Sequence, residues 1–298
     1  MSLSVKPIAQ NQMHIVERAD TLRLHVSSAR REGRRIGVVP TMGALHAGHL
    51  SLIDAARAEC EFVVLTIFVN PTQFGPGEDF ERYPRPLEDD LAQCRQAGVD
   101  LVFRPGVEAA YPPGFSTFVE VEALSSVLEG AFRPAHFRGV TTIVLKLLNV
   151  VQPDLAYFGR KDYQQQLLIR RMCVDLDVPV EIRTCPTVRE PDGLALSSRN
   201  AYLTSDERRS ALALLQSLSL AEQRLLGGAT DVAAVRAEMR SLLDRTPGVS
   251  VDYATVCGPE TLEELSVPQP EMIALAAARV GKTRLIDNLP IVLPRIER

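Results

Sequence analysis

The sequence predicts an α/β fold in which a Rossmann-like parallel sheet flanked by helices is followed by a smaller α+β C-terminal domain. Short apolar runs alternate with segments of helical period over the first two thirds of the chain, and these runs are continuously apolar rather than alternating. Such strands are buried on both faces, as in a parallel sheet covered by helices. The composition changes near Arg189, so we expect domains at 1–188 and 189–298.

Strands and helices alternate along the larger domain, as a parallel sheet requires. We expect strands at 36–39, 62–69, 101–103, 155–158 and 180–182, and helices at 50–58, 87–97, 140–151 and 164–176. Beyond Arg189, Pro191-Asp-Gly193 indicates a turn, and Gly227-Gly228 ends a long helical pattern. The smaller domain should hold helices at 206–226 and 231–244 and strands at 249–256, 272–280 and 283–286.

Composition narrows the class of protein. A chain of 298 residues with 46% hydrophobic and 23% charged residues is typical of a globular protein, and its net charge of −4 gives no general attraction to nucleic acid or acidic membranes. The five scattered cysteines lack CxxC spacing, which favours reduced thiols in the cytoplasm. No apolar run approaches a membrane span, and Met1 to Gln12 is too polar for a signal peptide. We expect a cytoplasmic enzyme or binding protein.

Two histidines three residues apart mark the junction between the first expected strand and the next helix. Gly37-Val-Val-Pro40 leads through a glycine-bearing turn to His46-Ala-Gly-His49. Imidazoles at this spacing share a helix face, and the N-terminus of a helix favours phosphate. Metal binding stays open, although only three other histidines are present (His14, His25 and His136). A capping role for one histidine, with the other exposed to solvent, also stays open.

Two further strand ends carry polar side chains that a core would exclude. Asn70-Pro-Thr-Gln73-Phe74 follows the second strand, and Gly159-Arg-Lys161-Asp162-Tyr-Gln-Gln165 follows a later one. Because parallel sheets bind ligands beyond the C-terminal ends of their strands, these segments should converge with the histidine turn on one crevice. Lys161 is one of only four lysines, and a compact ammonium suits charge that moves onto a phosphoryl oxygen.

Two better-known nucleotide motifs are not supported. Gly281-Lys282-Thr283 resembles the end of a phosphate loop, but the position where that motif requires an earlier glycine is Ala276. The strand pattern also continues past the lysine, so a β-hairpin turn explains the segment better. No Gly-x-Gly-x-x-Gly follows the first strand, which removes the main support for a dinucleotide-dependent dehydrogenase.

Two polar clusters are ambiguous by themselves. Ser197-Ser198-Arg199 offers two hydroxyls and a guanidinium to an oxyanion, but an N-cap serine beside a surface arginine is the favoured explanation of the triplet taken alone. Asp89 and Asp90 begin a helical pattern, where adjacent carboxylates are usually solvated and favourable to the helix dipole. We expect that solvated state in the free protein, with a weaker role in holding Mg²⁺ when ATP is present.

Several longer segments, in order along the chain, carry a closer resemblance. The chain is similar to the pantothenate synthetase (pantoate–β-alanine ligase) family, a branch of the nucleotidylyltransferase superfamily related to class I aminoacyl-tRNA synthetases. The segments that carry the resemblance are Pro40-Thr-Met-Gly-Ala-Leu-His-Ala-Gly-His49, Phe68-Val-Asn-Pro-Thr-Gln-Phe74, Arg133-Pro-Ala-His-Phe-Arg-Gly-Val140, Lys161-Asp-Tyr-Gln-Gln165, Leu196-Ser-Ser-Arg-Asn200 and Thr283-Arg-Leu-Ile-Asp-Asn288.

The resemblance implies an ATP-dependent ligase that condenses (R)-pantoate with β-alanine to give pantothenate, AMP and pyrophosphate through a pantoyl-adenylate. His46 and His49 would contact the phosphates of ATP. The family describes the residue at the position of His49 as a proton donor; we expect phosphate stabilisation instead, because adenylate formation moves no proton. Gln73 and Gln165 would bind pantoate, with β-alanine entering beside Gln73.

The same resemblance implies an ATP site built from three segments. Lys161, Ser197, Ser198 and Arg199 would neutralise the triphosphate and act in catalysis with the two histidines. The implied ATP-binding residues are Pro40, Thr41, Met42, Gly43, Ala44, Leu45, His46, Ala47, Gly48, His49, Gly159, Arg160, Lys161, Asp162, Val188, Leu196, Ser197, Ser198 and Arg199.

Two departures from the family pattern are visible, and two other functions stay open. Arg160 stands where the family commonly has an acidic residue, and Leu196 where methionine is common. Arg133 and His136 fit the pattern without an assigned role. An adenylyltransferase with a phosphate-bearing acceptor would need a more cationic acceptor pocket, and a nucleotide sensor would bind without turnover. The family also implies a homodimer, and we expect the smaller domain to act as a lid.

Overall fold

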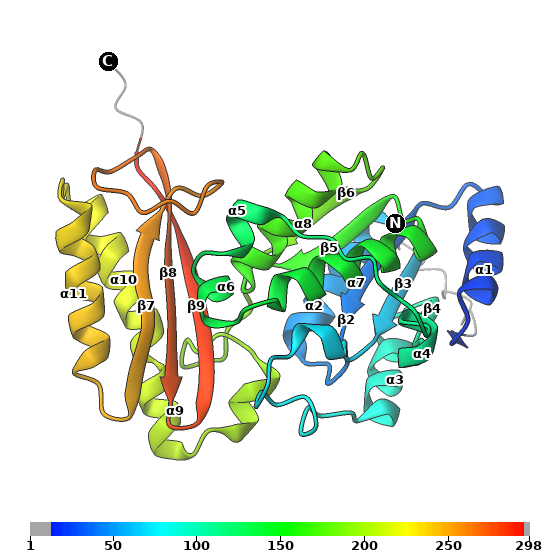
Figure 1. Ribbon diagram of the computed structural model, residues 1–298, viewed down its shortest axis with the longest axis horizontal. Helices are drawn as coiled ribbons and strands as arrows, with labels where there is room; N and C mark the ends of the chain where they lie inside the picture. The colour runs from blue at the N-terminus through cyan, green and yellow to red at the C-terminus, as the bar shows by residue number, and fades with distance from the viewer. Residues whose placement is uncertain (1–12, 295–298) are drawn as a thin grey trace, which may run out of the picture.

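A six-stranded parallel sheet forms the larger lobe of the computed structural model, which describes residues 13–294 (Figure 1). The segment Met1–Gln12 therefore lies outside the described residues. In spatial order the strands are β1 (His14–Val16), β4 (Leu101–Phe103), β3 (Phe62–Ile67), β2 (Ile36–Thr41), β5 (Leu155–Gly159) and β6 (Glu181–Cys185). From β2 the chain builds outward through β3 and β4 and then returns to add β5 and β6 on the other side. This arrangement confirms the predicted fold class and creates a crevice at the strand ends.

Helices cover both faces of this sheet. They are α1 (Ala19–Arg31), α2 (Ala47–Glu59), α3 (Leu87–Gln96), α7 (His136–Val151) and α8 (Tyr163–Asp175), with the short α4 (Val107–Ala110), α5 (Glu122–Ser125) and α6 (Glu129–Phe132). Alternate residues of β2 enter different cores: Val38 packs with α1, α7 and α8, whereas Val39 packs with α2 and α3. The sequence did not predict β1 or α1.

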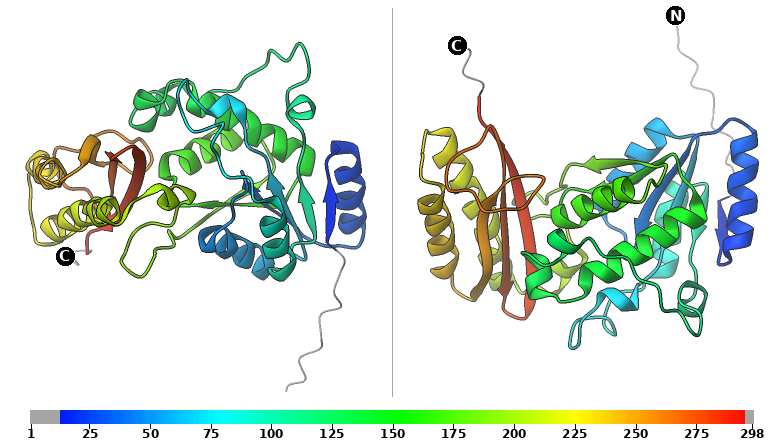
Figure 2. Two further views of the ribbon diagram at one scale, coloured as in Figure 1. Left: turned by 90° about the horizontal axis from the view of Figure 1, so that it is seen from below. Right: turned by 45° about the horizontal axis from the view of Figure 1, so that its top comes forward.

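The C-terminal lobe is a three-stranded antiparallel sheet whose two longer helices, α10 (Ala213–Leu226) and α11 (Val232–Asp244), lie on the side away from the larger lobe (Figures 1 and 2). Its strands are β7 (Val249–Cys257), β8 (Glu271–Val280) and β9 (Thr283–Val292), and its shorter helix is α9 (Ser205–Ala211). The single helix expected at 206–226 is thus divided at Leu212. Gly281 adopts φ 58° in the turn between β8 and β9, so the hairpin interpretation of Gly281-Lys282 is confirmed.

An apolar cluster and a buried ion pair join the two lobes. Phe137 and Leu168 of the larger lobe pack with Ile273 of β8 in one buried group of side chains. Beside it, the Arg284 guanidinium donates to both carboxylate oxygens of Glu129 at 2.5 and 2.8 Å. Removing one partner of such a pair would leave a buried charge unpaired, so the interface favours one relative position of the lobes.

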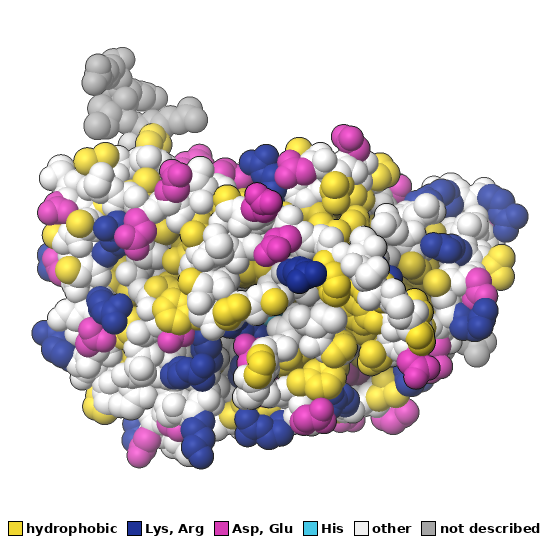
Figure 3. Space-filling model, in the orientation of Figure 1, with side chains coloured by type: hydrophobic (Ala, Val, Ile, Leu, Met, Phe, Trp, Pro, Cys, Tyr) yellow, Lys and Arg dark blue, Asp and Glu magenta, His cyan; other side chains and the backbone are white. Residues whose placement is uncertain are grey.

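The cysteines and the surface agree with the expectations from composition. All five cysteines are free, and four of them are buried. Lysine and arginine side chains are interspersed with acidic ones over the face shown in Figure 3. Among residues 13–294, no helix combines the length and the apolar character needed to cross a bilayer.

Candidate active site

The two histidines form a reciprocal cap at the start of α2. His46 is the N-cap rather than a helical residue, and its Nδ1 accepts a hydrogen bond from the Gly48 N–H at 3.1 Å. Nδ1 of His49 accepts from the His46 N–H at 3.3 Å, and the ring centroids lie 4.1 Å apart. A ring nitrogen that accepts carries no proton, so the proton of each neutral imidazole is on Nε2. The caps therefore leave two Nε2–H donors for a ligand.

Both imidazoles are neutral near pH 7. Burial is the main cause that lowers the pKa of His49, to about 3, and the neighbouring His46 and Lys161 act in the same direction. Burial, followed by Lys161, also lowers the pKa of His46 below its ordinary value. The pair can therefore donate hydrogen bonds to a phosphate without contributing a positive charge.

Asp90 anchors the turn that leads to the histidines. Its carboxylate accepts the N–H groups of Ala44 and Leu45 at 2.9 and 2.7 Å, and Asp90 is only 1% exposed. This hold stabilises a turn in which Gly43 and Ala44 both adopt positive φ, 81° and 52°. The expected solvated state is therefore wrong for Asp90, whereas Asp89 is exposed.

The pair Asp89 and Asp90 does not fit a ready magnesium site. Both oxygens of Asp90 are occupied by backbone donors beneath the histidine turn, and neither aspartate lines either of the two cavities of this region. Across the described part of the chain, no group of three histidine, cysteine or acidic side chains is arranged to hold a metal ion.

The other expected phosphate-binding groups lie on two separate loops. Lys161 sits in the turn between β5 and α8, where its Nζ lies 3.8 Å from the Asp162 carboxylate. Ser197 accepts the Arg199 N–H at 3.2 Å and thus caps the short 3₁₀ segment Ser198–Tyr202. The N-cap expected as an alternative is therefore present at Ser197, although Arg199 beside it is partly buried rather than a surface side chain. For the histidines the alternative of one cap and one solvated ring is wrong, because both rings take part in the cap and neither is exposed.

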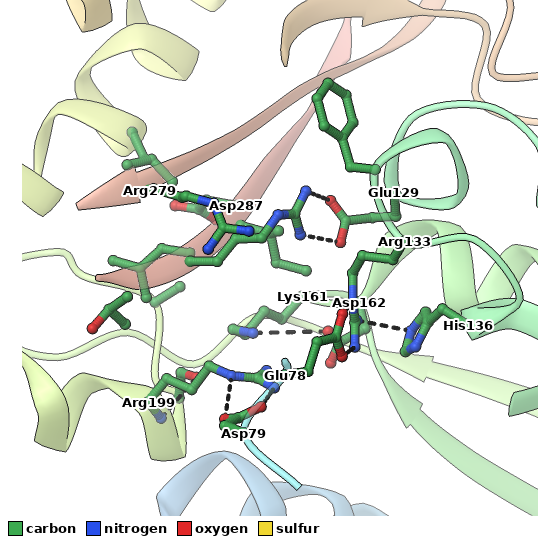
Figure 4. Close-up of a pocket in the computed structure, with 18 of the residues that line it drawn as sticks. Glu78, Asp79, Glu129, Arg133, His136, Lys161, Asp162, Arg199, Arg279 and Asp287 are labelled. Carbon is green, nitrogen blue, oxygen red and sulfur yellow. Dashed lines mark hydrogen bonds and ion pairs between the residues drawn. The ribbon is translucent and has the colours of Figure 1, made fainter. Parts of the chain in front are cut away.

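The Arg199 side chain is already paired with an acid. Its guanidinium donates two hydrogen bonds to the Asp79 carboxylate, at 3.0 and 2.9 Å. Asp79 lies on a loop for which the sequence predicted no function. The adjacent Glu78 pairs with Arg133 at 2.6 Å. Two consecutive acids of one loop therefore occupy two cations beside the crevice, and Figure 4 shows them among the residues of its wall.

One cavity of about 230 Å³ collects the predicted groups. His46 and His49 line it together with Lys161 and Ser198, although these residues come from segments far apart in the sequence. Of the predicted residues, it is lined by Pro40, Thr41, Met42, His46, Gly48, His49, Gln73, Gly159, Lys161, Asp162, Gln165, Val188, Leu196, Ser197, Ser198 and Arg199.

The remaining predicted residues do not reach either cavity of this region. Gly43, Ala44, Leu45 and Ala47 build the backbone of the histidine turn, and Arg160 lies outside both linings. A larger cavity of about 950 Å³ opens between the lobes. The residues shared by the two cavities, which mark where they adjoin, are Arg133, His136, Lys161, Asp162, Gln165, Ser197 and Arg199.

Gln73 is oriented by neighbours that sequence reasoning left without a role. Its Oε1 accepts from Asn70 Nδ2 at 3.1 Å, and Asn70 is 1% exposed. His136 Nδ1–H donates to the Gln73 carbonyl at 2.7 Å, while its Nε2 accepts from Arg133 at 3.1 Å. Burial, followed by Arg133, lowers the pKa of His136 to about 4, which keeps the ring neutral in this relay. Arg133 and His136 thus position the Gln73 loop.

Comparisons with known proteins agree with this geometry. The family model described as pantoate-beta-alanine ligase matches residues 14–290. Pantothenate synthetases from Moorella thermoacetica and Thermotoga neapolitana are 53% and 52% identical to this chain, each over 93% of it and over 98% and 99% of the relative. The solved pantothenate synthetase from Thermus thermophilus superposes with a TM-score of 0.89 at 48% identity, covering 95% of this chain and 100% of that one. A pantoate-beta-alanine ligase from Francisella tularensis, solved with beta-gamma ATP and beta-alanine, gives a TM-score of 0.77 at 35% identity over 93% and 97%.

Proposed function

The chain belongs to the pantoate-beta-alanine ligase family, and from that premise we propose how its cavity carries out the reaction. The protein is an ATP-dependent ligase that condenses (R)-pantoate with β-alanine to give pantothenate, AMP and pyrophosphate. The observation that supports a role for the predicted residues is the convergence of His46, His49, Lys161 and Ser198 on one cavity.

In the first step the pantoate carboxylate attacks the α-phosphorus of ATP. A P–O bond forms, the bond to the bridging oxygen breaks, and pyrophosphate leaves with the electron pair. The Nε2–H groups of His46 and His49 donate to phosphate oxygens, and the Lys161 ammonium balances the charge that moves onto the leaving group. Since no proton is transferred, fixed neutral donors and one cation supply what this step needs.

In the second step the β-alanine amine attacks the carbonyl of the pantoyl-adenylate. The new C–N bond replaces the C–O bond to AMP, which departs, and the amine loses its proton to solvent or to the departing phosphate. Gln73 and Gln165, which line the smaller cavity, are proposed to hold the hydroxyls and carboxylate of pantoate. Val140, Val144 and Leu147 of α7 supply an apolar wall for its two methyl groups.

The adenosine portion lies along the end of β5 in this proposal. Gly159 and Val188 line the smaller cavity there, next to Leu196. We place Mg²⁺ with the triphosphate itself, because that ion is commonly held by substrate phosphates and water. We also propose, as expected from the sequence, that the protein is a cytoplasmic homodimer. In this proposal the domain boundary lies at residue 189 and the smaller lobe acts as a lid.

Isotope exchange between pyrophosphate and ATP tests the route. Exchange should require pantoate and proceed without β-alanine, because the adenylate forms first. Folded protein that makes pantothenate but gives no such exchange would refute the adenylate route. Calorimetric titration with pantoate in the presence of ATP distinguishes a ligase from an adenylyltransferase with a phosphate-bearing acceptor.

A further inference from the structure

Asn288 of β9 reaches from the C-terminal lobe to the turn that carries Lys161. Its Nδ2 donates to the carbonyl oxygens of Arg160 and Lys161, both at 2.9 Å, and Asn288 is 2% exposed. The orientation of the amide follows from chemistry, since only its NH₂ group can face two carbonyls. One side chain of the smaller lobe thus satisfies two acceptors that flank the Lys161 α-carbon.

Besides Asn288, one backbone hydrogen bond holds the start of the Lys161 turn, from the Arg160 N–H to the Cys185 carbonyl at 2.8 Å, and it does not engage either carbonyl beside the Lys161 α-carbon. Helix α8 begins only at Tyr163, and its N-cap residue, Asp162, makes no side-chain capping bond. The ammonium of Lys161 lies 3.8 Å from the Asp162 carboxylate, beyond hydrogen-bond distance. Because the Lys161 ammonium makes no close hydrogen bond to this carboxylate, the direction in which the side chain projects depends mainly on the conformation of its backbone. The two hydrogen bonds from Asn288 act on that backbone.

Asn288 is itself held by a charged neighbour. The Asp287 carboxylate accepts the Asn288 N–H at 2.8 Å and pairs with both terminal nitrogens of Arg189, at 2.6 and 2.9 Å. Arg189 begins the connector that leads to Ser197 and donates to the Gly193 carbonyl at 3.1 Å. This chain of contacts links β9 to two of the three segments that form the proposed phosphate site.

We propose that Asn288 is a positioning residue that aims the Lys161 ammonium at the phosphates of ATP. The inference rests on the proposed role of Lys161 and adds that this role depends on an amide in the other lobe. Asn288 does not contact substrate, so its loss should slow the adenylation step while leaving pantoate binding nearly unchanged. A displacement of about 1 Å at a catalytic group is enough to cost about 100-fold in rate.

The test combines the near-isosteric Asn288→Asp variant with Lys161→Ala. The ionised carboxylate that Asn288→Asp introduces cannot donate to the two carbonyls. We expect pantoate-dependent exchange to fall about 10- to 100-fold with less than about a threefold change in the pantoate KM. If Asn288 acts through Lys161, adding Asn288→Asp to Lys161→Ala should cause no further loss. Should Asn288→Asp fail to fold in urea titrations, Asn288→Ser, which is smaller and keeps one donor, takes its place in the cycle.

Tyr163→Phe is the matched control. It removes another hydrogen bond between the lobes, from the Tyr163 hydroxyl to the Pro259 carbonyl at 3.0 Å, without touching the Lys161 carbonyls. This variant should keep the exchange rate within about threefold of the parent. The proposal would be overturned if the control and the Asn288 variant lost the same fraction of the exchange rate. It would also be overturned if the double variant were slower than Lys161→Ala alone by the full factor that Asn288→Asp costs in the parent. An unchanged rate in Lys161→Ala alone would instead reject the proposed role of Lys161.

Discussion

His49→Asn separates the capping role of His49 from its proposed role as a hydrogen-bond donor to phosphate. The oxygen Oδ1 of asparagine lies where Nδ1 of histidine lies, so it can still accept the His46 N–H that now forms a 3.3 Å hydrogen bond. Nothing in asparagine reaches the position of Nε2. His49→Gln is the complementary change, because its longer side chain can bring an N–H donor close to that position.

The expected magnitudes follow from these two roles. Loss of one preorganised donor to a developing charge costs about 10²- to 10³-fold in rate, or about 3–4 kcal/mol of transition-state stabilisation. The retained cap should keep the free energy of unfolding of the asparagine variant within about 1 kcal/mol of the parent, whereas His49→Ala, which loses both functions, should lose about 0.5–2 kcal/mol.

Single-turnover adenylate formation and urea unfolding are the assays. The asparagine variant should be folded but about 100-fold slower, and the glutamine variant should recover part of the rate. A parent-like rate in the asparagine variant would refute the donor assignment. An ionisation near pH 6.5 that controls the parent rate and vanishes in that variant would show that the charged imidazolium acts, contrary to the low pKa of His49.

Two other substitutions and one pH dependence test further parts of the structure. Gln73→Ala should raise the pantoate KM about tenfold, the scale of one lost hydrogen bond in a polar pocket, and equal pantoate dependence in mutant and parent would contradict its role. Asp79→Asn should tighten ATP binding about three- to tenfold in calorimetry, because Arg199 loses a competing carboxylate that now lies 2.9 Å away; unchanged or weaker binding would reject this. Burial is the main cause that lowers the pKa of His49 to about 3 in the folded protein. Between about pH 6.5 and pH 3 the unfolded chain therefore binds a proton at His49 that the folded chain does not. His49 should therefore stabilise the fold fully above pH 6.5 and lose that contribution toward pH 3, by at most about 1.4 kcal/mol per pH unit, and urea unfolding of His49→Asn should show a flatter pH dependence.

The larger sheet was predictable because its central strands are buried on both faces. Runs such as 62–67 are apolar at nearly every position, and burial of that kind leaves a clear pattern in the sequence. The edge strand β1 gave no such pattern, since it has three residues and only Val16 among them is buried. Likewise, no glycine or proline marks the division of the expected helix at Leu212.

The location of the site could be predicted from one topological rule, but the contacts that support its residues could not. Polar residues after successive parallel strands had to share an edge of the sheet, so the meeting of His49 with Lys161 could be expected. The hold of Asp90 on the histidine turn joins positions 45 residues apart and looks from the sequence like an ordinary helix start. The pairing of Asp79 with Arg199 joins positions 120 apart and has no local pattern. Such contacts arise only when the tertiary structure brings the two residues together.

The buried Glu129–Arg284 pair and the apolar cluster beside it make the stability of each lobe depend on the other. A destabilising substitution in the small sheet would release Arg284 from Glu129 and expose Phe137 and Leu168, so the larger lobe would also lose stability. Inherited variation far from any substrate can for this reason reduce the amount of active enzyme in a cell without altering a single catalytic group.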